Sequence, residues 1–224
     1  MTSFKIISKR LFLTSLVCLS TQMLLAQSKA DISDPKVQIT WLGIDFSQAK
    51  FFGSETDYKK SGELINCEFA GKYFTAWNNL FITEAKKYDV AKAIHRTNVP
   101  YALNVTDKVN SALTKDFFSE DSLTFKTLTE EAISDLVKKY DFQGKTGIGM
   151  IFFVEGMSKP MEKEGVWVTF VDMNSKTLLL TSYQAPKPGG FGFRNFWMKP
   201  FYTILKDMES GFDDLRKSTS SKGK

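Results

Sequence analysis

Few side chains in this sequence have the types and spacing that catalysis or metal binding requires. The single histidine, His95, lies in the run Ala-Ile-His-Arg without a carboxylate or a nucleophile pattern beside it. The two cysteines, Cys18 and Cys67, are far apart in the sequence. Zinc, haem and iron–sulfur sites typically need three or four such ligands. The composition therefore argues against metal chemistry of that kind, and we expect no cofactor.

The common hydrolase signatures are also missing, because GxSxG, HExxH and CxxC do not occur. A pair of carboxylates could still perform acid–base catalysis. Asp45 is the candidate, because it ends the first predicted strand, and ligands of open α/β sheets collect outside the carboxyl ends of strands. The alternative is that Asp45 is a turn or capping residue. The sequence favours a non-enzymatic protein over a secreted hydrolase that uses carboxylates.

A glycine-rich segment, residues 186–192 (PKPGGFG), precedes the last predicted helix. A helix amino terminus beside basic residues could hold an anion, but the aromatic residues that follow are unlike a phosphate cradle. Two alternatives remain open. Either the aromatic side chains fold inward and the glycines allow the strand-to-helix turn, or Phe191 and Phe193 are exposed and bind a partner, together with Arg194 and Trp197.

The amino-terminal segment has the organisation of a secretory signal. Basic residues within the first ten positions precede an apolar run at residues 11–25, and small residues follow. We expect cleavage after Ala26 or Ala30 and therefore a periplasmic or secreted protein. A retained membrane anchor is the alternative, but this run is short and interrupted by polar residues. A lipoprotein modified at Cys18 is disfavoured, because Val17 stands where a small residue is expected.

Signal cleavage also changes the charge. The whole chain has 30 basic and 25 acidic residues, a net charge of +5. Residues 1–26 hold three of the basic residues and none of the acidic ones, so the net charge falls to about +2. We therefore expect no nucleic-acid binding. After signal cleavage we also expect no stable membrane span. Cys67 is then the only cysteine, so we expect no internal disulfide and an inert, partly buried thiol.

Hydrophobic periodicity predicts four strands and three helices in the rest of the chain. The strands are residues 37–46, 146–155, 166–173 and 177–184, and the short turn at 174–176 makes the last two antiparallel. The helices cover residues 68–84, 127–140 and a segment after 192, and the second is capped by Thr127 with Glu130. Phe51 and Phe52 fall in a loop, and residues 86–126 hold only a possible short strand at 101–105.

These elements predict a single α/β (α+β) domain over residues 36–210. It contains a mixed sheet of four or five strands with helices packed on it, and antiparallel carboxyl-terminal strands precede a closing helix. A signal peptide (1–26) and a leader (27–35) come before the domain. A disordered polar tail (211–224) follows it.

Residues 136–208 resemble the anticodon-binding-like α/β module of exported envelope proteins, such as the amino-terminal domain of TolB and the curli-secretion and penicillin-binding-protein activator lipoproteins. The likeness rests on a hairpin pattern that is typical of these modules, in which Val and Asp are followed by a turn with Ser or Thr. The residues that match it here are Val171, Asp172, Asn174, Ser175 and Thr177. Residues 41–53 (WLGIDFSQAKFFG) and 189–197 (GGFGFRNFW) resemble uncharacterised exported proteins of Bacteroidota. The resemblance implies a cell-envelope binding or assembly module with an envelope protein as partner.

Overall fold

Among the residues that the structure describes, six strands form one mixed sheet. The computed structural model describes residues 26–53, 69–114 and 116–220. The strands are β1 (Ile39–Asp45), β2 (Lys50–Phe52), β3 (Phe118–Ser119), β4 (Ile148–Ser158), β5 (Lys163–Asp172) and β6 (Thr177–Gln184). Their order is β3-β2-β4-β5-β6, and β1 also pairs with β4. The prediction of one α/β domain with a mixed sheet is thus confirmed.

β4 is the central strand, because β1 and β2 share one of its edges and β5 pairs with the other. β1 pairs with the first half of β4 and β2 with the last three residues, both in parallel register. A tight turn separates them, in which the N–H of Ala49 donates to the carbonyl of Phe46 over 3.0 Å. β5 and β6 follow as antiparallel neighbours on the other side. β4 is buried along its whole length, which explains its nearly continuous apolar sequence.

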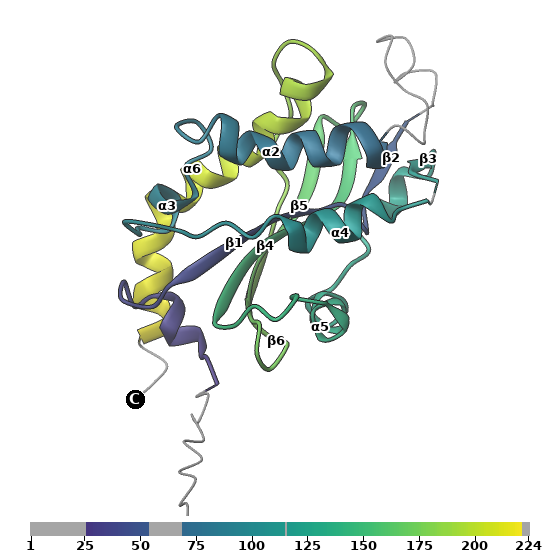
Figure 1. Ribbon diagram of the computed structural model, residues 1–224. Helices are drawn as coiled ribbons and strands as arrows, with labels where there is room; N and C mark the ends of the chain where they lie inside the picture. The colour runs from purple at the N-terminus through teal and green to yellow at the C-terminus, as the bar shows by residue number, and fades with distance from the viewer. Residues whose placement is uncertain (1–25, 54–68, 115, 221–224) are drawn as a thin grey trace, which may run out of the picture.

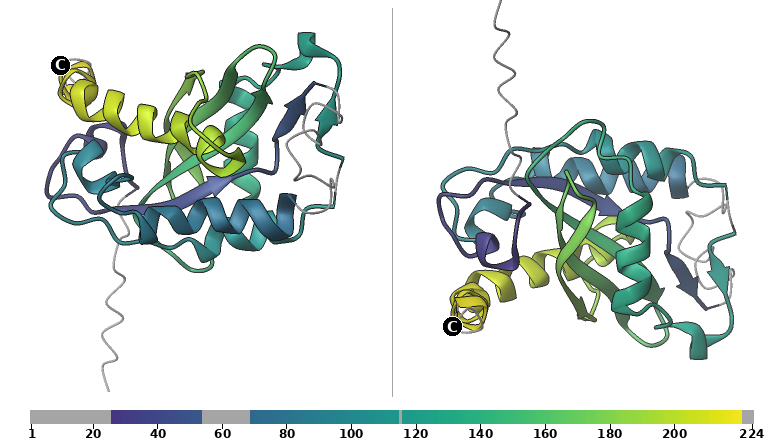
Figure 2. Two further views of the ribbon diagram at one scale, coloured as in Figure 1. Left: turned by 90° about the horizontal axis from the view of Figure 1, so that it is seen from above. Right: turned by 90° about the horizontal axis from the view of Figure 1, so that it is seen from below.

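Helices cover both faces of the sheet (Figures 1 and 2). The helical elements are η1 (Lys29–Ile32), η2 (Phe69–Phe74, a π-helix), α2 (Thr75–Thr83), α3 (Val90–Ala93), α4 (Asn104–Ser111), η3 (Ser122–Thr124), α5 (Glu130–Lys139) and α6 (Phe193–Ser220). The larger core lies between one face and α2, α3 and α6. The smaller core lies between the other face and α5.

The outer edge of β1 is closed by side chains from two helices. Asn78 of α2 both accepts from the N–H of Ile44 (2.7 Å) and donates to its carbonyl (3.0 Å). From α4, Asn110 donates to the same carbonyl and Thr106 donates to the carbonyl of Leu42. These buried amide and hydroxyl groups form the hydrogen bonds that a further strand would otherwise form with the backbone of β1. Without them, buried backbone groups would be unpaired, which is strongly unfavourable.

A glycine makes this edge possible. Gly43 has a φ of +100° and lies at the point where the register between β1 and β4 shifts. A Cβ atom at this position would lie 2.5 Å from Oγ1 of Thr106 and 2.7 Å from Oδ1 of Asn78. Only glycine therefore fits both the left-handed conformation and the close approach of the two helices.

Several elements differ from their predictions. Phe51 and Phe52 lie in β2 and are buried, since this short segment pairs with both β3 and β4. Tyr101 forms only an isolated bridge with Trp41, and the segment after it begins α4. The cap of α5 is Thr129, whose hydroxyl accepts from the N–H of Ala132, while the N–H of Thr127 donates to the buried Glu155. α6 continues past residue 211, where we expected a disordered tail. Cys18 and Cys67 lie outside the described residues.

Candidate binding groove

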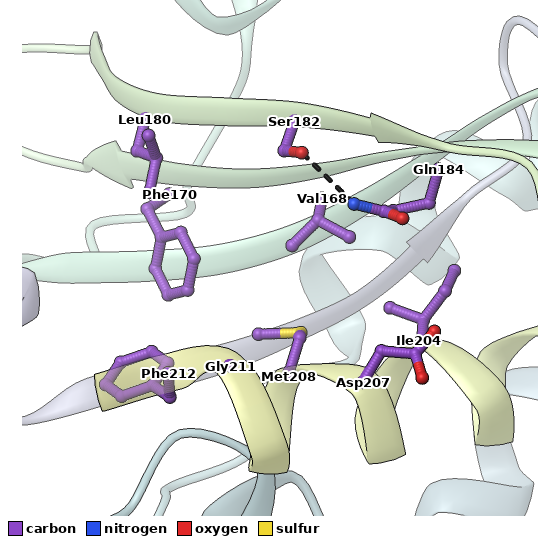
Figure 3. Close-up of a pocket in the computed structure, with 10 residues that line it drawn as sticks. All are labelled: Val168, Phe170, Leu180, Ser182, Gln184, Ile204, Asp207, Met208, Gly211 and Phe212. Carbon is purple, nitrogen blue, oxygen red and sulfur yellow. Dashed lines mark hydrogen bonds between the residues drawn. The ribbon is translucent and has the colours of Figure 1, made fainter. Parts of the chain in front are cut away.

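A groove of about 210 Å³ lies between the end of the sheet and the second half of α6 (Figure 3). Its floor is formed by β5 and β6, and α6 forms its wall. Six apolar side chains and three polar ones line it, together with Gly211: Val168, Phe170, Leu180, Ile204, Met208, Phe212, Ser182, Gln184 and Asp207. Apolar lining with a few polar groups is the usual composition of a binding site.

The floor follows from strand alternation and one irregularity. Val168 and Phe170 are two residues apart on β5, so both point to the face that α6 covers. In β6, Leu180 pairs with Phe170 while Leu178 pairs with Val171, so the register shifts at Leu179. After this bulge, Leu180 and every second residue beyond it face the groove. Without the bulge, regular alternation would have placed these residues on the opposite face of the sheet.

The wall follows from helical spacing. Ile204, Met208 and Gly211 are four and three residues apart, so they lie on one side of α6. The space beside Gly211 is open, because a Cβ built on it meets no atom within 4 Å. Phe212 closes one end, where the ring of His95 lies 5.6 Å from its ring. The Nε2 atom of His95 is 2.8 Å from the carbonyl of Glu209, so His95 has the structural role that its sequence context favoured.

The polar groups gather on the open side of the groove. Ser182, Gln184 and Asp207 are exposed, and the side-chain amide of Gln184 donates to Oγ of Ser182 over 3.2 Å. A ligand lying here would meet an apolar floor and a rim with one carboxylate and one amide.

β6 is the last strand on its side of the sheet among the described residues. Its sequence, TLLLTSYQ, contains no charged residue and no proline. Edge strands of natural proteins usually carry charges, prolines or other features that prevent pairing with another chain. This strand carries a single bulge. Its face toward α6 lines the groove, and α5 packs against it as part of the smaller core.

The predicted catalytic candidate Asp45 is buried, with 1% of its surface exposed. One carboxylate oxygen accepts from the N–H of Ser47 (2.6 Å), and the other accepts from the hydroxyl of Tyr140 (2.8 Å). The first contact is an Asx turn at the end of β1. The second ties β1 to the end of α5. This geometry matches the alternative of a turn residue.

The four residues of the predicted partner site are not brought together on one surface. Phe191 is 96% exposed and Arg194 is exposed, where its guanidinium lies 3.2 Å from Oε1 of Glu84. Phe193 is 9% exposed and stacks on Trp77 in the larger core, and Trp197 is buried beside it. A surface formed by both Phe191 and Phe193 is therefore not present. The helix begins at Phe193, so its first turn already faces the core.

Glu155 and Glu164 are two of the three further carboxylates that are buried in the sheet. Glu155 accepts from the N–H groups of Thr127 and Leu128 and from the indole of Trp167, the last over 2.8 Å. Glu164 on β5 is fully buried, and neither of its carboxylate oxygens has a hydrogen-bond partner among the described residues. Burial therefore raises the pKa of Glu164 well above its ordinary value.

Sequence patterns indicated that the residues lining the groove lie on apolar strand and helix faces, but they did not indicate the groove. Gly211 borders part of its open space, and sequence analysis placed this residue at the start of the tail. Within the described ranges, no helix is long and apolar enough to cross a membrane, and no three side chains of the metal-binding types cluster together. Comparison with protein-family models, curated proteins and solved structures finds no match for this chain.

Proposed function

We propose that the protein is an exported cell-envelope module without catalytic activity, and that it binds an extended segment of a partner protein along β6. The observation that supports this most strongly is that the uncharged last strand of the described sheet lines an apolar groove. Recognition by strand addition uses these two features, because backbone hydrogen bonds supply affinity and pockets for alternate side chains supply specificity.

The groove restricts the chemistry of the partner segment. A strand paired with β6 places every second side chain on the face of Leu180, Ser182 and Gln184. Those side chains are apolar where they face Leu180 and the apolar wall formed by Ile204 and Met208. A hydrogen-bond donor or a basic group fits where the chain passes the carboxylate of Asp207.

The export part of the proposal rests on the sequence. The basic start, the apolar run at residues 11–25 and the small residues after it are those of a secretory signal. The envelope modules that residues 136–208 resemble belong to the same compartment. The competing hydrolase would need Asp45 to face a substrate, whereas this carboxylate is buried between Ser47 and Tyr140.

Photo-crosslinking in intact cells tests the site. A crosslinking residue replaces Ser182, whose side chain faces the groove, and a second strain carries it at Asn79, an exposed position on α2. Both are combined with Gly211→Phe, which fills the groove, and with Gly211→Ala as the matched control. We expect a discrete adduct at position 182 with Gly211→Ala that Gly211→Phe abolishes.

An adduct that survives Gly211→Phe, or the same adducts from Asn79, would show that the groove is not the interface. An adduct of twice the mass of the chain would identify a second copy as the occupant and would contradict a distinct partner. Fractionation of the same cells tests export separately, since an exported protein is found outside the cytoplasm.

A further inference from the structure

The first residues of the described chain contact a buried carboxylate. The backbone N–H of Gln27 donates to Oδ2 of Asp172 over 3.0 Å, across 145 positions of sequence. Asp172 is the last residue of β5 and has no exposed surface. The start of the chain is thereby fixed to the end of a central strand.

The two oxygens of Asp172 have different partners. Oδ1 accepts from the N–H groups of Asn174 (2.9 Å) and Ser175 (3.4 Å) in the turn between β5 and β6, whereas Oδ2 faces Gln27. Burial by itself would raise the pKa of Asp172, but these hydrogen bonds hold it below its ordinary value. Asp172 is therefore a buried anion, and all the donors that the described residues give it are neutral.

A buried carboxylate is most favourable when a cation pairs with it. The group that donates to Oδ2 is the backbone N–H of Gln27, and a peptide nitrogen of this kind becomes a cation in one circumstance. If the bond before it is hydrolysed, it becomes an α-ammonium group, which is mostly protonated below about pH 8.

We propose that the peptide bond between Ala26 and Gln27 is the processing site of this protein, and that the new α-ammonium group of Gln27 forms an ion pair with Asp172. The inference rests on the export proposed above. In the reaction one water adds across the bond, so that Ala26 retains the carboxylate and Gln27 the ammonium group. No other reactant is needed besides the peptidase that catalyses it.

The structure distinguishes this site from the alternative after Ala30. Ser28 and Asp31 form a reciprocal cap, in which the N–H of Ser28 lies 2.6 Å and its Oγ 2.8 Å from Oδ2 of Asp31. Ala30 lies within η1, and its carbonyl accepts from the N–H of Ser33. Cleavage there would remove the cap from a segment whose Ile32 is completely buried. Cleavage after Ala26 leaves every one of these contacts in place.

The ion pair is tested with purified chains that begin at Gln27. One form has a free α-amino group and the other is Nα-acetylated, which keeps the N–H donor and removes the charge. Each is made in the wild-type and the Asp172→Asn background, and unfolding by urea is followed. We expect acetylation to raise the unfolding equilibrium constant of the wild type about ten-fold, because a charged hydrogen bond is lost. In the Asp172→Asn background, acetylation should change this constant little. Equal effects in the two backgrounds would overturn the ion pair.

A second measurement does not require Asp172→Asn to fold. An amino-terminal glutamine cyclises when its free amine attacks the side-chain amide carbon and releases ammonia, and a paired ammonium group cannot attack. We expect Gln27 to cyclise several-fold more slowly in the folded protein than in a peptide of residues 27–36, measured by mass spectrometry. Equal rates would contradict the pairing.

Mass spectrometry of the protein from fractionated cells tests the processing site. An exported chain that begins at Gln27, cyclised or not, supports the inference. An exported chain that begins at Asp31 overturns the inference and leaves the proposed export intact. A full-length chain in the cytoplasm overturns both.

Discussion

The backbone N–H of Gly189 donates to the carbonyl of Phe196 over 3.0 Å. In a regular helix this carbonyl would accept from the N–H of residue 200, but that residue is Pro200 and has no N–H. The glycine-rich segment therefore supplies the donor that the helix lacks, and it is held against the first turns of α6. The N–H of Gly189 thus has a structural role that is independent of any anion.

This contact predicts a coupling between Gly189 and Pro200. Gly189→Pro removes the donor, and we expect it to lower the free energy of unfolding by about 1–3 kcal/mol, the cost of an unpaired buried acceptor. In a Pro200→Ala background Phe196 regains a helical donor, so the same substitution should cost less. Chemical unfolding of the four chains measures this difference. Equal costs in both backgrounds would show that the Gly189 contact does not compensate for Pro200.

Gly43→Ala should be strongly destabilising. The new Cβ would lie 2.5 Å from Oγ1 of Thr106, in a backbone conformation with a φ of +100°. We expect a loss of about 3–5 kcal/mol, at the upper end of single substitutions. Gly71→Ala is the matched control, because a Cβ at that position meets no atom within 4 Å. The prediction fails if urea unfolding gives the two variants similar stability.

Glu164 makes the stability depend on pH. The unfolded chain releases this proton near pH 4.5, whereas burial keeps the carboxyl protonated in the native state to a higher pH. Between these two pKa values the native state binds more protons, so its stability decreases as the pH rises. Glu164→Gln removes this contribution, and the variant should gain stability relative to the wild type as the pH increases from 4.5. Parallel curves of unfolding free energy against pH would contradict the assignment.

Tyr140 should remain protonated across the accessible pH range. Burial, followed by the charge of Asp45 and the hydrogen bond to it, raises the pKa of the Tyr140 phenol far above its ordinary value. Ultraviolet titration should therefore show the same number of ionising tyrosines in the wild type and in Tyr140→Phe. The variant should also be less stable by about 1–3 kcal/mol, because Asp45 loses a buried donor. A missing titration step in Tyr140→Phe would refute this.

The sequence was most informative where local periodicity determines structure. The strands β4, β5 and β6 and the helices α2 and α5 have apolar patterns long enough to identify them, and the fold class follows. β2 was missed because its three residues become a strand only by pairing with β4, about a hundred positions later. α4 was missed because its buried polar residues Thr106 and Asn110 face the backbone of β1 and do not mark an apolar face.

The candidate site was harder to predict than the fold. Asp45 was placed correctly at the end of a strand, but its burial depends on Tyr140, which is distant in sequence. The groove is bordered by residues that follow a bulge at Leu179 and by the small residue Gly211, and each of these features is inconspicuous within its own element. Only the packing of α6 on β5 and β6 makes them parts of one surface.

Hydrogen exchange of β6 tests the central claim most directly. The purified protein is compared alone and in complex with the partner that is crosslinked at position 182. Strand addition predicts that amides of residues 177–184 slow on binding, together with those of residues 204–212 in α6. Protection confined to the segment around Phe191, with β6 unchanged, would contradict the account.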